Sequence, residues 1–198
     1  MKAMVRDSFG GPDVLELRDV ERPGVAAGEV LVRVHASSVS IGDWFWLTGT
    51  PLVMRPVSGI LRPRDPILGR DVAGVVEAVG ADVTSLAVGD EVYGEISGGA
   101  HAEYVAASED ALTRKPANLT FEQASAVGVS AFTALQVFRD HAEIQPGDKV
   151  LINGASGGVG TFAVQVAKTY GAEVTGVCST RNVDMIRSIG ADHVIDYT

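Results

Sequence analysis

The stretch Lys149-Val150-Leu151-Ile152-Asn153, continued by Gly154-Ala155-Ser156-Gly157-Gly158-Val159-Gly160, decides the fold of this 198-residue chain. An apolar run, a glycine-rich turn and an amphipathic segment from Thr161 to Tyr170 predict a strand, a tight turn and a helix. Glycines at set positions let bare backbone amides approach a pyrophosphate and let the helix pack closely on its strand. The pattern A-x-G-x-x-G therefore predicts a dinucleotide-binding turn, and the alternative is a plain strand-to-helix turn.

The residues after this turn repeat the alternation of strand and helix. We expect a strand over Glu173–Cys178, a helix over Asn182–Ile189 and a strand over His193–Tyr197. Strand-helix-strand-helix-strand is one mononucleotide-binding half of a Rossmann doubly wound parallel sheet, whose full strand order is 3-2-1-4-5-6. Without a fourth strand, the outer edge of the Lys149–Asn153 strand would stay unpaired. We expect either a truncated piece of a longer protein or a minimal form with an open edge.

The end of the second strand predicts which dinucleotide binds. A carboxylate there would bind the ribose 2′-hydroxyl and repel a 2′-phosphate. Cys178 occupies that place, and Ser179 and Arg181 follow it with a hydroxyl and a positive charge that suit a phosphate. These residues favour NADP(H). The alternatives are a solvated Arg181 at a helix start and a small buried hydrophobe at Cys178, for which we expect no reactive role.

The first 120 residues show short alternating apolar segments, separated by turn clusters such as Phe9-Gly10-Gly11-Pro12. This pattern predicts a partly open β-barrel. A helix from Ile41 to about Leu47, capped by Ser40, and a loop between Thr50 and Pro66 interrupt it. The expected strands are Lys2–Arg6, Val14–Val20, Val30–His35, Val72–Val79, Glu91–Ile96 and Ala102–Ala106.

The hydrophobic period becomes helical from Thr120 onward. Thr120 and Gln123 form a capping-box pattern, and a longer helix is expected over Ser130–His141. We therefore expect two domains, the barrel over residues 1–120 and the nucleotide-binding domain over residues 121–198.

Composition excludes several classes of function. A formal net charge of -9 argues against a nucleic-acid partner and an anionic membrane surface, because neither is attracted to an acidic protein that has no basic patch. The most apolar stretch, Ala124 to Phe138, falls short of the roughly 20 residues that a membrane span needs. Cys178 is the one cysteine, so neither an intrachain disulfide nor a cysteine-rich zinc site can form. The N-terminal residues lack the apolar core of a signal peptide, and we expect a cytoplasmic protein.

Further motifs extend over nearly the whole chain: Gly28-Glu29-Val30-Leu31-Val32-Arg33-Val34, Gly69-Arg70-Asp71-Val72-Ala73-Gly74-Val75-Val76, Gly89-Asp90-Glu91-Val92, Ala102-Glu103-Tyr104 and Gly190-Ala191-Asp192. Together with the glycine turn they resemble the medium-chain dehydrogenase/reductase superfamily. Within it they resemble the zinc-free branch of quinone oxidoreductase-like and NAD(P)-dependent alcohol dehydrogenase-like proteins. The resemblance implies an N-terminal GroES-like partly open β-barrel followed by a Rossmann domain.

The zinc-using relatives hold their metal with a Cys after the third strand, a His in a Gly-His-Glu motif and a further Cys or Asp. This sequence has Ser40 at the first of these positions and Gly69-Arg70-Asp71 at the second, and it lacks the four-cysteine lobe that holds a structural zinc. The resemblance therefore implies no metal site. The histidines have no ligand spacing and are expected at the surface or in the core: His35, His101, His141 and His193.

The resemblance also implies site residues. In the zinc-free branch the position of Ser40 is commonly Asn, followed three residues later by an acid, as Asp43 is here, and both face the nicotinamide and the substrate. Ser40 would donate a hydrogen bond to a developing oxyanion, and Asp43 would orient groups or relay a proton; alternatively Asp43 is a first-turn carboxylate that the helix dipole stabilises. Thr133 matches a position near the nicotinamide carboxamide, and Tyr197 one near the 2′-phosphate. Either could instead be a core or edge residue.

The implied activity is NADPH-dependent hydride transfer to a quinone, an enone or an aldehyde without zinc. Trp44, Trp46 and the proline-rich loop would form an apolar pocket for a small hydrophobic substrate. The rival interpretation is a truncated or non-catalytic NADP(H)-binding module. We expect the chain either to be monomeric or to form a homo-oligomer through the open strand edge.

Overall fold

The computed structural model describes residues 1–198, without the side chain of Met54. The chain forms two compact units, Met1–Gly128 and Val129–Thr198. Helix α3 (Phe121–Ser125) belongs to the first unit, because it packs on strands β3, β4 and β5 of that unit. The sequence analysis placed the boundary after residue 120.

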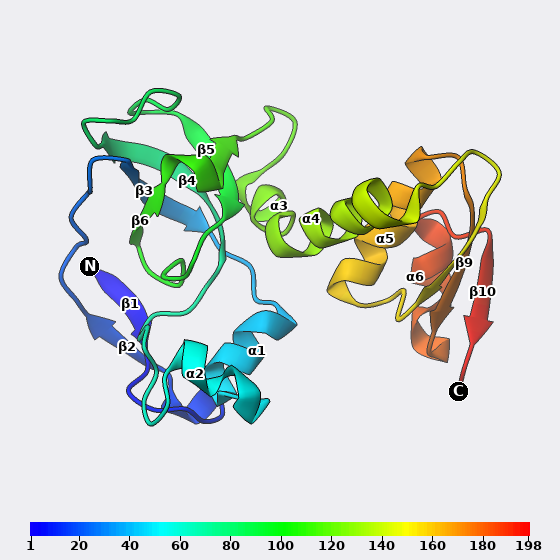
Figure 1. The fold of residues 1–198 in the computed structure, drawn as a ribbon, viewed down its shortest axis with the longest axis horizontal. Coiled ribbons are helices and arrows are strands. Elements are labelled where there is room, and N and C mark those ends of the chain that lie inside the picture. The colour runs from blue at the N-terminus through cyan, green and yellow to red at the C-terminus, as the bar shows by residue number, and fades with distance from the viewer. The chain divides into compact units, whose positions relative to one another are not determined.

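The centre of the first unit is a five-stranded antiparallel sheet in the order β6-β3-β4-β5-β7 (Figure 1). The sheet does not close into a ring, since β6 and β7 form its two edges. The valines of the strands supply the core on one face, among them Val30, Val32, Val72 and Val92. The strands are β3 (Glu29–Ala36), β4 (Asp71–Val79), β5 (Glu91–Glu95), β6 (Tyr104–Ser108) and β7 (Leu112–Arg114). The expected partly open barrel is confirmed, and β7 is a short strand that the sequence analysis did not predict.

The first unit also has a two-stranded sheet of β1 (Lys2–Val5) and β2 (Glu16–Asp19), and a bridge between Ala3 and Ala102 links β1 to the segment just before β6. Helix α1 (Ile41–Thr48) begins after Ser40 as predicted and ends at Gly49, whose left-handed φ of 63° suits a residue without a side chain.

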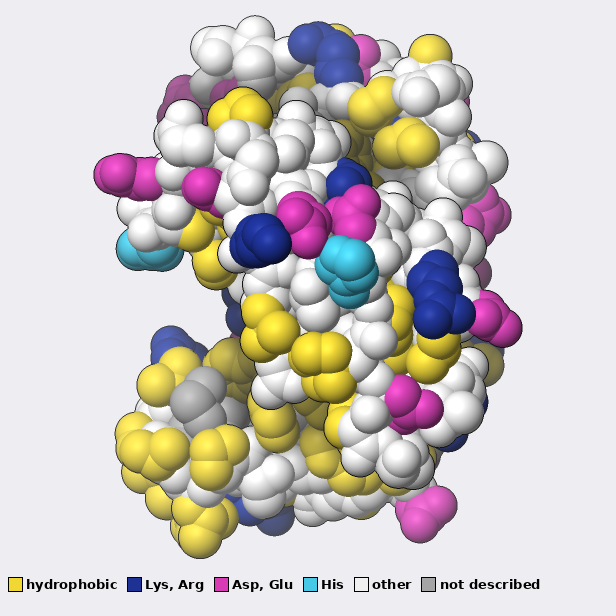
Figure 2. Space-filling model, turned by 90° about the vertical axis from the view of Figure 1, so that its right-hand side faces the viewer, with side chains coloured by type: hydrophobic (Ala, Val, Ile, Leu, Met, Phe, Trp, Pro, Cys, Tyr) yellow, Lys and Arg dark blue, Asp and Glu magenta, His cyan; other side chains and the backbone are white. Residues whose placement is uncertain are grey.

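The segment between Thr50 and Pro66 is not wholly a loop. It contains a 3-10 turn η2 (Leu52–Met54) and a short helix α2 (Arg55–Ser58). The expectation of a loop was wrong for these residues, because Pro56 lies in the first turn of a helix, where its missing N–H costs no hydrogen bond. Figure 2 shows hydrophobic side chains gathered at the lower left of the face it presents, over η2 and α2, where Leu52, Val53 and Val57 are exposed.

The second unit is built on a parallel sheet in the order β10-β9-β8, with β8 (Lys149–Asn153), β9 (Glu173–Cys178) and β10 (His193–Asp196). Helix α5 (Gly158–Thr169) packs on β8 and β9, and α6 (Val183–Ser188) packs on β9 and β10 (Figure 1). This order is the one predicted for the first half of a doubly wound sheet. The core of the unit includes Val164, Val174, Cys178 and Ile186.

Three boundaries in the second unit differ from the prediction. Helix α4 (Gly128–Val137) begins before Ser130 and continues as a π-helical turn η4 (Phe138–Ala142). Helix α5 begins at Gly158, so the last glycines of the turn already form its first helical turn. A 3-10 turn η5 (Thr180–Asn182) precedes α6. None of the described helices is both long enough and apolar enough to cross a membrane.

Candidate functional site

The glycine turn between β8 and α5 has the geometry that a close backbone approach requires. Gly154 adopts a left-handed φ of 70°, and Gly157 caps α5 with an extended backbone. A Cβ on Gly160 would lie 2.2 Å from the carbonyl oxygen of Gly154, so a side chain there would force the turn and the helix apart. A Cβ on Gly154 would meet nothing within 4 Å, which leaves this side of the turn open.

The same turn presents backbone to the outside. Gly157, Gly158 and Val159 are exposed, and Ser156 is half-buried. The first backbone N–H groups of a helix have no partner within it and carry its positive dipole end. Exposed glycines ahead of the 12-residue helix α5 therefore form a cradle that suits a pyrophosphate.

Ala155 lies on the buried side of this turn. Its side chain is fully buried in the core of the second unit, and its N–H donates to the Val177 carbonyl at 3.0 Å. The alanine therefore ties the turn to β9, whereas Ser156 to Val159 face outward.

Ser179, Arg181 and Tyr197 follow the ends of two neighbouring parallel strands. Cys178 ends β9 fully buried, and its partner in the sheet is Asp196 of β10, one residue before Tyr197. The Ser179 hydroxyl accepts a hydrogen bond from the Asn182 side chain at 3.2 Å, and Tyr197 is 69% exposed. Arg181 is exposed and makes no ion pair among the side chains that the structure describes. A hydroxyl, a phenol and a free guanidinium thus lie at one edge of the sheet.

Thr133 lies on the exposed side of α4. Its hydroxyl donates to the Val129 carbonyl of the preceding helical turn at 2.6 Å. The hydroxyl oxygen can still accept a hydrogen bond from another group.

The first unit contains an apolar hollow of about 460 Å³. Trp44 lies in its wall as predicted, but Trp46 and the segment 50–66 do not, so the expectation that they form the pocket was wrong. Trp46 faces a separate small cavity. The residues around the hollow are Met4, Pro12, Leu15, Ser37, Val39, Asp43, Trp44, Leu47, Leu68 and His101.

Asp43 brings a carboxylate to this hollow from the first turn of α1. It is only 5% exposed, and its Oδ2 accepts hydrogen bonds from the Ser40 N–H at 2.8 Å and the Ser40 hydroxyl at 3.1 Å. Ser40 lies behind Asp43 and is not in the wall of the hollow. Asp43 therefore caps its helix and borders the hollow at once.

His101 is the second titratable group in the wall, and the sequence analysis did not assign it to a site. It is half-buried, and its Nε2 lies 3.3 Å from the Ser38 carbonyl oxygen. A Cβ on Gly69 would lie 2.6 Å from the His101 ring, so Gly69 in the Gly69-Arg70-Asp71 motif leaves the space for this histidine. A glycine at position 69, where φ is a left-handed 95°, is the signal in the sequence that could have indicated this close approach.

The positions that hold zinc in the relatives carry other chemistry in this chain. Arg70 forms an ion pair with Glu95 at 2.7 Å, and the buried Asp71 accepts a hydrogen bond from the Ser38 hydroxyl at 2.6 Å. Within the described part of the chain, no group of three or more His, Cys, Asp or Glu residues is placed to hold a metal ion. The Arg70 side chain is a cation, and the Ser40 hydroxyl is hydrogen-bonded to Asp43, so neither side chain suits a zinc ion.

Comparison with protein families finds two matching domains. Residues 26–117 match the alcohol dehydrogenase GroES-like domain, and residues 158–198 match a domain described as zinc-binding dehydrogenase. The first match covers most of the sheet of the first unit, and the second covers α5 through β10.

Comparison with individual proteins also finds oxidoreductases among the relatives of this chain. The chain is 40% identical to the quinone oxidoreductase of Sus scrofa over 201 aligned residues and 37% identical to a mitochondrial NAD(P)H oxidoreductase of Mus musculus over 222. It is similar to the structure of the quinone oxidoreductase from Coxiella burnetii, with a TM-score of 0.90, 36% identity and all of the chain covered. It is also similar to a mycobacterial protein complexed with NADPH, with a TM-score of 0.88 and 30% identity over the whole chain.

The chain spans little more than half the length of the relatives it matches. It covers 59% of the Sus scrofa protein, 54% of the Mus musculus protein, 62% of the Coxiella burnetii structure and 59% of the mycobacterial structure.

Proposed function

Because the chain belongs to the medium-chain dehydrogenase/reductase superfamily, we propose that it binds NADPH and acts in hydride transfer to a small hydrophobic quinone, enone or aldehyde without zinc. The observation that carries this proposal is the glycine turn that leads into α5, where Gly157 and Gly158 are exposed and the buried Gly160 has no room for a side chain. The relatives named quinone oxidoreductase and NAD(P)H oxidoreductase support the reaction class.

The preference for NADPH rests on the end of β9. No carboxylate stands at Cys178 itself, and the carboxylate of its sheet partner Asp196 accepts a hydrogen bond from the Thr198 N–H at 3.0 Å. The Ser179 hydroxyl, the Arg181 guanidinium and the Tyr197 phenol follow the ends of the same two strands. A 2′-phosphate accepts charge-assisted hydrogen bonds from such groups, whereas a 2′-hydroxyl gains little from them. The NADPH complex of the mycobacterial neighbour supports this choice.

Replacement of Arg181 tests the cofactor preference. We expect Arg181→Ala to raise the Kd for NADPH about tenfold, the loss of about 1.4 kcal/mol, and to leave NADH binding unchanged. Arg187→Ala is the matched control, because Arg187 is also exposed and has only a 3.9 Å ion pair with Asp184 on its own helix. Equal weakening of NADPH and NADH by Arg181→Ala would contradict the role of the 2′-phosphate.

Each unit, taken by itself, has residues that suit one part of the proposed work. The cofactor, when bound, supplies the hydride and holds the redox chemistry. The glycine turn would hold its pyrophosphate, and Thr133 would accept a hydrogen bond from its carboxamide. The apolar hollow would hold the acceptor away from water, and Asp43 would present a carboxylate to it. Ser40 donates its hydroxyl hydrogen to Asp43 and is not in the wall of the hollow, so it would have to turn away from Asp43 and into the hollow to stabilise a developing oxyanion.

Variants of this pair test its assignment. We expect Ser40→Ala and Asp43→Ala each to lower turnover by ten- to a hundredfold, since one oriented hydrogen bond to a transition state is worth at least this much. Ser37→Ala serves as a control, because Ser37 also borders the hollow but donates its hydroxyl hydrogen to the Asp71 carbonyl. Unchanged turnover in both Ser40→Ala and Asp43→Ala would contradict the assignment of these two residues to the site.

The absence of zinc from the proposed reaction rests on residue chemistry. Ser40 and Arg70 stand where relatives carry metal ligands, and a guanidinium repels a divalent cation. Metal analysis of the purified chain is expected to find less than one zinc per chain. Stoichiometric zinc would overturn this part of the proposal.

An NADP(H)-binding module without catalysis is the second candidate. Its support is the length of the chain relative to its relatives, together with strand β8, which pairs only with β9. Titration of the 198-residue chain with NADPH and NADH, followed by a scan of quinones, enones and aldehydes for cofactor oxidation, separates the two. NADPH binding with turnover supports the enzyme; NADPH binding without turnover on any acceptor supports the module.

The cytoplasmic location expected from the sequence also remains a proposal. The Mus musculus relative is a mitochondrial protein, and its name supports no cytoplasmic location. Fractionation of cells that make the protein, with blotting of each fraction, checks the proposal.

A further inference from the structure

A second, much smaller cavity lies next to the hollow in the first unit. Its volume is about 20 Å³, and Arg6, Asp43 and Arg70 are among the residues that line it. Asp43 and Leu68 border both this cavity and the hollow. The carboxylate of Asp43 thus forms part of the wall between the two spaces.

Three buried polar atoms around this cavity have no hydrogen-bond partner in the described part of the chain: Arg6 Nε, Asp43 Oδ1 and Arg70 Nε. Their residues are otherwise engaged. Arg6 donates to the Trp46 carbonyl through Nη1, Arg70 to Glu95 through Nη2, and Asp43 accepts from Ser40 through Oδ2. Buried polar atoms in native proteins are almost always paired, so each of these three atoms needs a partner that the side chains do not supply.

The burial of Arg6 and Asp43 makes the missing partner costly, whereas the Arg70 side chain is 37% exposed although its Nε is buried. Arg6 is 1% exposed and Asp43 is 5% exposed, and burial lowers the pKa of Arg6 while Asp65 opposes that shift. A charged group that is taken out of water loses stability unless each of its polar atoms is satisfied.

The chemistry of the three atoms selects the occupant. The two Nε–H groups donate, and the Asp43 oxygen accepts. A cation would be repelled by the two guanidinium groups. An anion would be attracted by them, but it has no hydrogen to donate to the Asp43 oxygen and would leave that acceptor unpaired. A water molecule accepts from two donors and donates to an acceptor, and it needs about 10–15 Å³ of space.

We propose that Arg6, Asp43 and Arg70 form a binding site for one buried water molecule, and that this water fixes the Asp43 carboxylate at the wall of the hollow. Arg6 follows strand β1, Asp43 lies on α1 and Arg70 precedes β4, so one water joins three elements that are far apart in the sequence. Arg6 and Arg70 are positioning residues, since they act on the hollow through Asp43. This proposal does not depend on the proposed activity.

A crystal structure of the 198-residue chain, at a resolution that shows ordered water, tests the site directly. We expect one water within about 2.7–3.2 Å of Arg6 Nε, Asp43 Oδ1 and Arg70 Nε. A soak in bromide, located by its anomalous scattering, distinguishes an anion from water. Bromide in the cavity, no density there, or a direct ion pair of Asp43 with either arginine would overturn the proposal.

Two variants of the Arg70–Glu95 pair separate positioning from simple stability. Arg70→Met removes the Nε donor together with the ion pair, whereas Glu95→Gln removes the ion pair and keeps the donor. We expect the water and the 2.8 Å contact between Ser40 N and Asp43 Oδ2 to persist in Glu95→Gln, and the water to be lost and Asp43 to rotate in Arg70→Met.

Melting temperatures give a second measurement. We expect each single variant to lower the Tm by about 2–4 °C. If the water couples Asp43 to Arg70, the double variant of Asp43→Asn and Arg70→Met lowers the Tm by less than the sum of the two single shifts. In the double variant of Asp43→Asn and Glu95→Gln, the two shifts are expected to add up. An unchanged Asp43 position in Arg70→Met, or additive shifts for both pairs, would contradict the positioning role.

Discussion

Gly157 and Gly160 occupy the same turn, but the structure places different demands on them. A Cβ on Gly160 would lie 2.2 Å from the Gly154 carbonyl oxygen and 2.8 Å from the Ala155 Cα, both of which are backbone atoms that cannot move aside. A Cβ on Gly157 would lie 3.3 Å from the Gly154 oxygen, and its φ of -79° suits any residue. Gly160 therefore serves the packing of α5, and Gly157 serves the surface that a ligand approaches.

Two alanine variants separate these demands. We expect Gly160→Ala to cost about 1–3 kcal/mol of folding free energy, because overpacking displaces backbone. We expect Gly157→Ala to leave the Tm almost unchanged and to raise the Kd for NADPH about tenfold, because a methyl group would hold the pyrophosphate away from the amides. Thermal melting and cofactor titration measure the two effects. Normal NADPH affinity in a folded Gly157→Ala variant would contradict binding of the pyrophosphate at this turn.

For Asp43, the sequence left two roles open. Its position three residues after Ser40 predicted both a first-turn carboxylate and a site residue, and nothing in the sequence could separate the two. The structure shows one side chain with a capping oxygen and a second oxygen turned away from Ser40. The cap uses one acceptor of the carboxylate and leaves the other for the proposed site.

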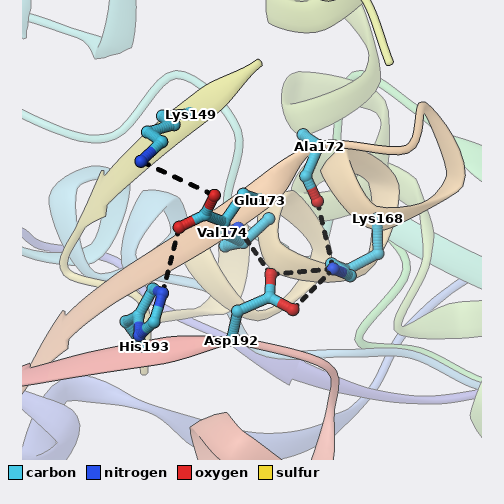
Figure 3. A network of polar contacts seen from close by, with 7 residues as sticks. All are labelled: Lys149, Lys168, Ala172, Glu173, Val174, Asp192 and His193. Carbon is cyan, nitrogen blue, oxygen red and sulfur yellow. Dashed lines mark hydrogen bonds and ion pairs between the residues drawn. The ribbon is translucent and has the colours of Figure 1, made fainter. Parts of the chain in front are cut away.

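At the scale of elements, Asp192 joins the helix and the sheet of the second unit (Figure 3). Its carboxylate accepts from Lys168 Nζ of α5 at 2.7 and 2.9 Å and from the Val174 N–H of β9 at 2.7 Å. Lys168 also donates to the Ala172 carbonyl, so the turn between α5 and β9 is held from both sides. The hydrogen bond from Lys168, followed by that from Val174, lowers the pKa of Asp192 below its ordinary value.

The lowered pKa predicts a dependence of stability on pH. The ionised Asp192 stabilises the fold above the ordinary carboxyl pKa of about 4, and this contribution is lost as pH falls through the lowered pKa. We expect Asp192→Asn to lower the Tm at neutral pH and to lose less of its Tm than the unchanged protein between about pH 5 and pH 2. Melting curves across this range measure the difference.

Asp184→Asn is the control for this prediction, because Asp184 is an exposed carboxylate whose 3.9 Å ion pair stays within its own helix. The two variants should differ in their acid dependence. Parallel Tm curves for Asp192→Asn and the unchanged protein would show that the ionised Asp192 in Figure 3 contributes nothing to the acid dependence of stability.

At the scale of the whole molecule, the outer edge of β8 is open. Among the described strands, β8 pairs only with β9, and Leu151 in its centre is 63% exposed. An exposed strand edge with an apolar side chain is a template for pairing with another chain. The order of the sheet therefore predicts self-association of the 198-residue chain.

A charge on this strand tests the prediction. We expect the unchanged chain to form larger species as its concentration rises, and Leu151→Lys to shift it toward the monomer, because a lysine on an edge opposes pairing. Leu61→Lys is the matched control, since Leu61 is 88% exposed but lies outside any strand. Sedimentation velocity measures the species. A monomer at every concentration, or an equal effect of the two lysines, would contradict association through β8.

The sequence by itself determined the order of elements and the class of each unit. Alternation of apolar residues with a period of two marks strands, a helical period marks helices, and glycines mark turns that exclude side chains; these signals are local, so β8, β9 and the cap of α1 were predicted from neighbouring residues. The start of α5 was misplaced because glycine lowers helix propensity, and tertiary packing of Gly160 on the turn overrides it.

Only the tertiary structure decided which side chains share a space. His101 and Asp43 are separated by more than fifty residues and still border one hollow, whereas Trp46, two residues from Trp44, faces another cavity. The atoms of Arg6, Asp43 and Arg70 that have no hydrogen-bond partner belong to residues that line one cavity for the same reason. Side-chain direction depends on the rotation of each helix and the register of each strand against its neighbours, which are set by packing between distant segments and leave no local pattern in the chain.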